Sequence, residues 1–180
     1  FNKVSVLKLN STKNFNTGIY PYSIMQSSFF PLDGNEHALK ISASVQEWCG
    51  QVYMQLNNRE DFDITSHSYF AGEADQYLKL NPIHLENEIW NLLRIDLDRV
   101  PVGSFKILPS FEFLRLNHLP VRAFNAEGQF LTNEQYHIYQ LHYPELNRTL
   151  KIYLGKMTPF PIEKWEESAP AGKSLNAEIL

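Results

Sequence analysis

The chain has 180 residues, of which 43% are apolar and 13% aromatic, and its 16 basic and 20 acidic side chains give a formal net charge of -4. This apolar content is enough for a hydrophobic core, so disorder is excluded as a description of the whole chain. The charges form no blocks, so neither nucleic acid nor an anionic membrane surface is favoured as a partner. No apolar run approaches the roughly 20 residues of a membrane-spanning helix.

Strand-like segments separated by turn signals follow one another along most of the chain. The expected strands cover residues 4–9, 19–30, 38–56, 62–70, 76–80, 105–116, 121–131, 136–143, 149–154 and 160–165. Glycine, proline, asparagine and aspartate stand between them, as they do in the turns of hairpins. This rhythm predicts a meander of antiparallel strands.

The segment 38–56 changes phase near its middle. Its apolar residues occupy odd positions up to Val45 and even positions from Val52 onward. Because strand side chains alternate with a period of two, a change of face within one strand indicates an inserted residue. The pattern therefore predicts a β-bulge or sharp bend between Gln46 and Gln51, with Gly50 as its site, and a sheet that curves there.

One segment, residues 83–95, has the period of a helix. Asn81 is expected as its N-cap and Pro82 at its first helical position. Its apolar stripe predicts burial of Leu85, Ile89, Leu92 and Leu93.

These elements together predict a mainly β protein, in which a curved antiparallel sheet carries one packed α-helix. We expect a single β-rich domain over residues 1–167. The segment 168–180 is small, polar and without a clear period, and it is expected to form a flexible or docking tail.

Three stretches of sequence resemble a known family. Residues 4–10 with 17–22, residues 44–50, and residues 142–150 are similar to a family of exported, often lipid-anchored proteins of the Bacteroidota that carries the label septum formation inhibitor Maf. The resemblance implies a periplasmic or outer-membrane-anchored location, with any targeting signal upstream of Phe1. It implies no activity, because true Maf pyrophosphatases carry a Ser-Pro-Arg-Arg signature and this sequence has neither Ser-Pro nor Arg-Arg.

A looser likeness concerns the fold. Residues 85–98, followed by Pro101 to Gly103 and by strands that end at 150–154 and 159–165, resemble periplasmic half-barrel proteins of the LolA and LolB kind. The likeness implies a curved sheet with a helix in its concavity, and a fold by itself does not carry a function.

Two neighbouring residues could support catalysis. Cys49 is the one cysteine of the chain and stands two residues after Glu47. Since no base or electropositive setting is visible around the thiol, Cys49 is expected to be buried and inert. A hydrolase-type enzyme that uses Glu47 or Cys49 is the alternative.

Four residues are the candidates for binding a ligand or partner: Glu47, Trp48, Tyr53 and Tyr69. The alternation of the strand places Glu47 on the inner face unless the bulge turns it to solvent. Aromatic side chains around it either fill the core or line a site on the concave sheet.

No metal and no cofactor are expected. His84 and Glu88 stand one helical turn apart, but no further ligands with metal-site spacing accompany them, so the pair is interpreted as a solvated helix face. The sequence favours a non-enzymatic protein that binds a partner protein or an apolar, lipid-like ligand on its curved sheet, and the resemblance implies that it is a protein of the cell envelope. An accessory subunit of an outer-membrane assembly is a further alternative.

Overall fold

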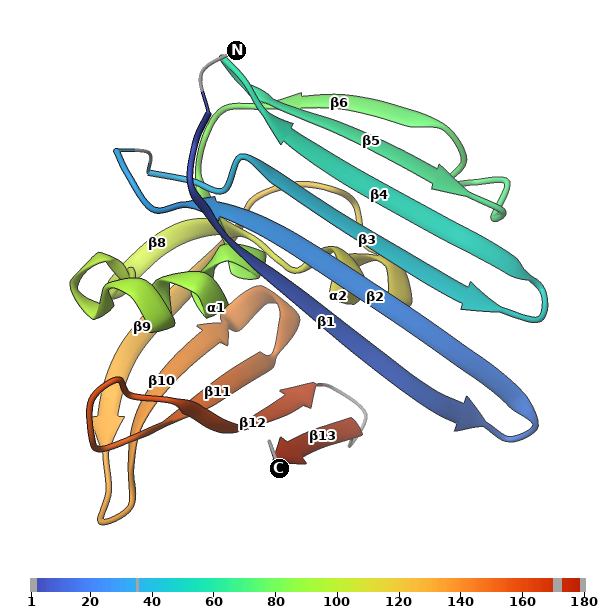
Figure 1. Ribbon diagram of the computed structural model, residues 1–180. Helices are drawn as coiled ribbons and strands as arrows, with labels where there is room; N and C mark the ends of the chain where they lie inside the picture. The colour runs from blue at the N-terminus through green and yellow to red at the C-terminus, as the bar shows by residue number, and fades with distance from the viewer. Residues whose placement is uncertain (1–2, 35, 170–172, 179–180) are drawn as a thin grey trace. The chain divides into compact units, whose positions relative to one another are not determined.

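The computed structural model describes residues 3–34, 36–169 and 173–178, and most of them form antiparallel strands (Figure 1). The strands are β1 (Val6–Thr17), β2 (Tyr20–Pro31), β3 (Lys40–Glu47), β4 (Gly50–Asn58), β5 (Phe62–Ser68), β6 (Gln76–Leu80), β7 (His84–Leu85), β8 (Gly103–Leu108), β9 (Phe124–Thr132), β10 (Tyr136–Tyr143), β11 (Arg148–Gly155), β12 (Ile162–Ala169) and β13 (Lys173–Glu178). The helices are α1 (Glu86–Ile95) and α2 (Phe111–Leu116), with short 3-10 helices η1 (Leu97–Arg99) and η2 (Pro144–Leu146).

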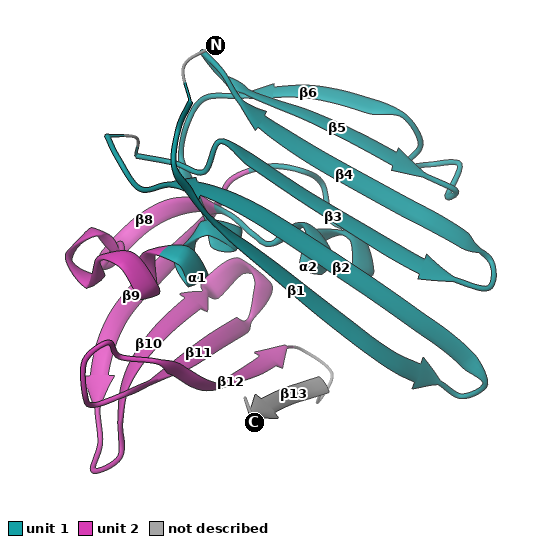
Figure 2. Cartoon of the chain, viewed as in Figure 1, with its two compact units in different colours: residues 1–91, 108–122 teal, residues 92–107, 123–180 magenta. Residues whose placement is uncertain are grey.

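The chain divides into two compact units (Figure 2). Unit 1 holds residues 1–91 and 108–122, and unit 2 holds residues 92–107 and 123–180. The fold contains two antiparallel sheets, one of them curled into a half-barrel, and α1 is the one α-helix of seven residues or more among the described residues. The predicted fold class is therefore confirmed. A single domain over residues 1–167 stays a prediction, because a division into compact units does not show whether the units fold independently.

The sheet of unit 1 is a simple meander in which β1 to β6 pair in chain order. One face of it is the core, where the side chains of Ile24, Phe30, Ile41, Met54 and Ile64 are at most 2% exposed. Because successive side chains of a strand point to opposite faces, the residues between them lie on the other face, and these are mostly Asn, Gln, Ser, Thr and Tyr.

The predicted bulge between Gln46 and Gln51 is wrong. The chain instead makes a hairpin there, with β3 ending at Glu47 and β4 beginning at Gly50. In this register an odd residue pairs with an even one, as Val45 does with Val52, so the apolar side chains of both strands reach the same face. A two-residue turn thus produces the change of phase that an inserted residue was expected to produce.

Helix α1 begins later than predicted. Its first residue is Glu86, so Asn81 is not its N-cap and Pro82 does not lie in its first turn. The backbone N–H of Leu85 donates a 3.1 Å hydrogen bond to Oε1 of Glu88. A glutamate side chain that reaches back in this way satisfies a free N–H group at the start of a helix, which fixes the start at this position.

Glu88 is buried, which corrects the interpretation of His84 and Glu88 as a solvated helix face. Its carboxylate accepts hydrogen bonds from the backbone N–H of Ala38 at 2.8 Å and contacts Nδ1 of His37 at 2.9 Å. His84 is half-buried, and desolvation lowers the pKa of its imidazole. These contacts tie the first turn of α1 to the segment that precedes β3.

The prediction of a strand over residues 105–116 is correct for its first part only. The segment forms β8 up to Leu108 and then the short helix α2. Ser110 is the N-cap of α2, because its Oγ accepts a 3.3 Å hydrogen bond from the backbone N–H of Phe113. With only six residues, α2 is too short to show a helical period in the sequence.

Buried polar side chains hold both helices against the sheet of unit 1. Asn91 of α1 accepts a 2.5 Å hydrogen bond from Ser28 Oγ of β2, and Asn87 Nδ2 donates to Gln26 Oε1 at 2.8 Å. Nε2 of Gln26 also donates to Glu112 Oε2 of α2 at 2.7 Å. Buried polar groups that are paired in this way fix one arrangement of the elements, because other arrangements would leave them unsatisfied.

The six strands of unit 2 follow the order β13-β12-β11-β10-β9-β8. Arg148 is 1% exposed there and its Nε donates a 2.7 Å hydrogen bond to Glu167 Oε1. Gly128 lies where a Cβ atom would come within 2.4 Å of the carbonyl oxygen of Pro101 and 2.6 Å of the hydroxyl of Tyr139. Glycine at this position lets the backbone approach the Tyr139–Pro101 hydrogen bond closely.

The segment 168–180, expected to be a flexible or docking tail, has a described part with strand backbone. Strand β12 continues to Ala169, and β13 pairs with it in an antiparallel register that joins Ser168 to Ser174. Residues 170–172, 179 and 180 lie outside the described residues. The described part of this segment therefore extends the sheet of unit 2.

Candidate functional site

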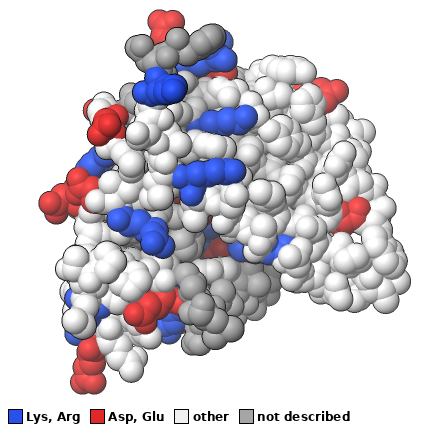
Figure 3. Space-filling model, viewed as in Figure 1, with Lys and Arg blue, Asp and Glu red and all other residues white. Residues whose placement is uncertain are grey.

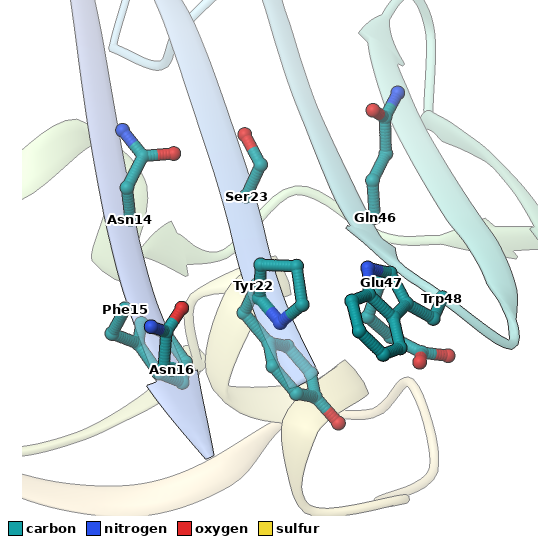
Figure 4. Close-up of a pocket in the computed structure, with 9 residues that line it drawn as sticks. Asn14, Phe15, Asn16, Tyr22, Ser23, Gln46, Glu47 and Trp48 are labelled. Carbon is teal, nitrogen blue, oxygen red and sulfur yellow. The ribbon is translucent and has the colours of Figure 1, made fainter. Parts of the chain in front are cut away.

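A shallow recess of about 520 Å³ lies at the hairpin ends of β1, β2 and β3 in unit 1 (Figure 4). Its nine lining residues come from three adjacent strands and the turn that follows the third, namely Asn14, Phe15, Asn16, Pro21, Tyr22, Ser23, Gln46, Glu47 and Trp48. We call this feature the hairpin recess.

The register of the strands arranges these residues in rows across the sheet. Asn14 pairs with Ser23, and Ser23 pairs with Gln46, so these three side chains form one row. Two residues nearer the β1–β2 turn, Asn16 pairs with Pro21, and Trp48 follows β3 on that side. A polar row and a mixed row of Asn16, Pro21 and Trp48, about 7 Å apart along the strands, therefore flank the recess.

The row between them faces the other way. Phe15, Tyr22 and Glu47 alternate with the residues of the two flanking rows, so their side chains lie on the opposite face of the sheet. The rings of Phe15 and Tyr22 stack there with centroids 5.2 Å apart. The backbone of this middle row is then the floor of the hairpin recess.

Exposed apolar side chains surround the recess. The indole of Trp48 is 64% exposed and meets the ring of Tyr20 edge to face at 5.5 Å. Ile19 in the β1–β2 turn is 72% exposed. Large apolar side chains gathered at one place on a surface are typical of a contact site for another molecule.

Glu47 is held on the inner side of its hairpin by two donors. The hydroxyl of Tyr69 donates to Oε1 at 2.5 Å, and the backbone N–H of Cys49 donates to Oε2 at 2.8 Å. The hydrogen bond from Tyr69, followed by that from Cys49, lowers the pKa of the Glu47 carboxyl. The same contact raises the pKa of the Tyr69 phenol.

The expectation that Cys49 is buried is wrong, because its side chain is exposed in the β3–β4 turn. Hydrogen bonding and charge repulsion from Glu47 raise the pKa of the Cys49 thiol above its usual value. A raised pKa disfavours the thiolate, which is the nucleophilic form. Cys49 is therefore accessible but poorly activated.

Three of the four binding candidates come together, and one does not. Trp48 and Glu47 line the hairpin recess, and Tyr69 reaches it indirectly through its hydrogen bond to Glu47. Tyr53 lies on the polar face of β4, where its hydroxyl donates to Gln55 Oε1 at 2.6 Å, and it does not line the recess. Tyr53 therefore lies apart from the other three candidates.

Sequence reasoning missed the polar residues of the recess, namely Asn14, Asn16, Ser23 and Gln46. Polar residues at alternate strand positions look like ordinary solvent-facing positions. One signal was present, however. Residues 14–32 contain no Lys, Arg, Asp or Glu, and residues 41–58 contain only Glu47. Figure 3 shows this scarcity of charge: white atoms, which belong to uncharged residues, cover most of the hairpin ends of β1 to β4.

In the described part of the chain, no three His, Cys, Asp or Glu side chains lie close enough together to hold a metal ion. None of the described helices has both the length and the hydropathy that crossing a membrane requires.

Comparison of the chain with protein families, with curated proteins and with solved structures gives no match.

Proposed function

We propose that the chain is a non-enzymatic binding protein of the cell envelope, and that its binding surface is the hairpin end of β1 to β4. One observation carries this proposal: the indole of Trp48 is 64% exposed beside the hairpin recess. Tryptophan is the residue type that most often dominates the energy of an interface, and a large exposed ring gains free energy when a partner covers it.

The contacts of the two candidate catalytic groups support binding over catalysis. A carboxyl that acts as a general acid near neutral pH needs a raised pKa, whereas the hydrogen bonds to Glu47 lower its pKa. A nucleophilic cysteine needs a lowered thiol pKa, whereas Glu47 raises the pKa of Cys49. A hydrolase that used Glu47 as its general acid or Cys49 as its nucleophile would need the opposite pKa shifts.

The form of the recess favours a partner with polar groups over a purely apolar, lipid-like ligand. Sites for apolar ligands are enclosed and bury most of the ligand, while this recess is shallow and the side chains of Asn14, Asn16, Ser23 and Gln46 bring amide and hydroxyl groups to it. An accessory role in an outer-membrane assembly would use the same surface. The envelope location follows from the resemblance to exported lipoproteins of the Bacteroidota.

The proposal is tested by site-specific photo-crosslinking in the cells that produce the protein. A benzophenone amino acid replaces Trp48 in one variant and Tyr77 in the other. Tyr77 is a matched control, because it is exposed on the polar face of the same sheet but lies on β6, away from the recess. We expect a defined cross-linked product from position 48 in the envelope fraction, and no such product from position 77.

Two results would contradict the proposal. One is the same pattern of cross-links from both positions, which would indicate random collision. The other is the recovery of the protein from the envelope fraction without any product at position 48.

A further inference from the structure

The polar side chains around the hairpin recess have free hydrogen-bonding groups. Asn14, Asn16, Ser23 and Gln46 are all exposed, and none of their side chains hydrogen-bonds another group of the described residues. Their amides and hydroxyl supply donors and acceptors side by side. A ligand in the recess would therefore meet a surface that can both give and accept hydrogen bonds.

The charge of the surroundings limits which ligand fits. With no charged side chain in residues 14–32, and with the Glu47 carboxylate bound on the opposite face by Tyr69, the recess offers no countercharge to a phosphate, a carboxylate or an ammonium group. An anionic or cationic ligand would lose its hydration there without compensation. The ligand that fits is uncharged.

The ring of Trp48 limits the shape of the ligand that fits the recess. It lines the recess from the end of β3, next to the row of Asn16 and Pro21. The face of an indole carries partial negative charge and attracts the slightly positive C–H groups of a ring laid on it. A molecule with C–H groups on one side and hydroxyl groups around its edge matches an aromatic ring flanked by amides.

We propose that the hairpin recess binds a neutral oligosaccharide, with one sugar ring stacked on Trp48 and its hydroxyl groups hydrogen-bonded to Asn14, Ser23 and Gln46. This rests on the proposed function, since it names the chemistry recognised at the same surface. A lipid chain fits less well, because it would cover the amides without satisfying them. A charged polymer fits less well because the recess has no countercharge.

The test is isothermal titration calorimetry of the full 180-residue chain with neutral hexasaccharides of glucose, mannose, galactose, xylose and N-acetylglucosamine. At least one should bind, and its affinity should change little between low and high salt, because no charges are paired. Trp48→Ala should weaken binding by about tenfold or more. Asn14→Ala and Gln46→Ala should each weaken it by about three- to tenfold.

Matched controls separate the recess from the rest of the surface. Tyr77→Ala removes an exposed aromatic ring, and Gln129→Ala removes an exposed amide of β9, and both should leave the affinity unchanged. All five variants should melt near the wild-type temperature, because every replaced side chain is exposed.

Three outcomes would overturn the inference: no hexasaccharide binds, a sulfated hexasaccharide binds more tightly than its neutral parent, or Trp48→Ala binds as well as the wild type. Binding to phosphatidylcholine vesicles that depends on Trp48, without any oligosaccharide binding, would also overturn it. If these results came with a defined cross-link from position 48, the proposed function would stand and only the choice of ligand would fall. If the cross-link also failed, both would fall.

Discussion

The phenol of Tyr69 lies 2.5 Å from Oε1 of Glu47 and donates a hydrogen bond to it, although 22 residues separate them in the chain. The contact joins the segment after β5 to the tip of the β3–β4 hairpin. It also fixes the Glu47 carboxylate on the side of the hairpin away from Asn14 and Ser23, so this charge does not reach the ligand-facing rows.

Tyr69→Phe should raise the pKa of the Glu47 carboxyl toward its usual value, because the largest cause of its lowered pKa is removed. A carboxyl whose pKa is lower in the folded state stabilises the fold above its unfolded pKa, and this contribution disappears as the pH falls through the folded pKa. The variant should therefore lose stability at neutral pH and lose less at acid pH. NMR titration of Glu47 and urea unfolding at both pH values measure the two effects.

Tyr53→Phe is the control, since that phenol bonds Gln55 rather than Glu47. An equal shift of the Glu47 pKa in both variants would contradict the assignment of the effect to Tyr69.

Gly50→Ala should disturb the same contact from the other side. An added Cβ would lie 2.6 Å from Cγ and 3.0 Å from Cβ of Tyr69, so the phenol would have to leave its present rotamer, and even then the contact with the Tyr69 Cβ would remain. Overpacking of this kind costs about 1–3 kcal/mol. Urea unfolding should show this loss, and the Glu47 pKa should rise as it does in Tyr69→Phe. Gly72→Ala, where nothing lies within 4 Å, should cost much less.

The alternation of apolar residues predicted most of the fold. Strands β6 and β10 have the bounds that the sequence predicted, and the opposite phases before Val45 and after Val52 correctly placed both segments on the buried face. The cause of the phase change was misjudged, because Trp48 and Cys49 lack the Asn-Gly or Gly-rich pattern of a recognisable two-residue turn. Local patterns therefore specified the faces better than the connections.

The candidate site depended on contacts that no local pattern contains. Trp48 and Glu47 were singled out because they stand next to the phase change, and both line the hairpin recess. The register that brings Asn14, Ser23 and Gln46 into one row follows from pairing between three strands. Register is a property of the assembled sheet, so a single strand's sequence could not reveal this row.

Glu88→Gln should destabilise the fold although it keeps the shape of the side chain. Glu88 is 0% exposed, and its two oxygens accept from the backbone N–H groups of Leu85 and Ala38. An amide has one oxygen, so its NH2 group would face one of these donors, and such a loss costs roughly 2–3 kcal/mol. Urea unfolding measures it. Glu134→Gln, at an exposed position, should change the free energy of unfolding little, and equal effects of the two would contradict this account.

Leu93→Asp should unfold the protein or cost about 4 kcal/mol or more, because Leu93 is 1% exposed and an aspartate there would be a charge without water. Circular dichroism during thermal unfolding detects the loss. Arg94→Ala changes the next residue of α1, which is exposed, and should leave the melting temperature nearly unchanged. A Leu93→Asp variant that melts like the wild type would mean that α1 is not packed as the structure describes.

Cys49 should react with iodoacetamide at a rate set by its pKa rather than by burial. The thiol is exposed, but Glu47 raises its pKa, so the native protein should react more slowly than the denatured chain near neutral pH. As the pH rises, the native rate should approach the denatured rate, since an exposed thiolate is free to react once it forms. Glu47→Gln removes the negative charge and should shift the native pH–rate profile toward lower pH. Native labelling that stays slow at the most alkaline pH the fold withstands would instead indicate a buried thiol, and an unchanged profile in Glu47→Gln would rule out Glu47 as the cause.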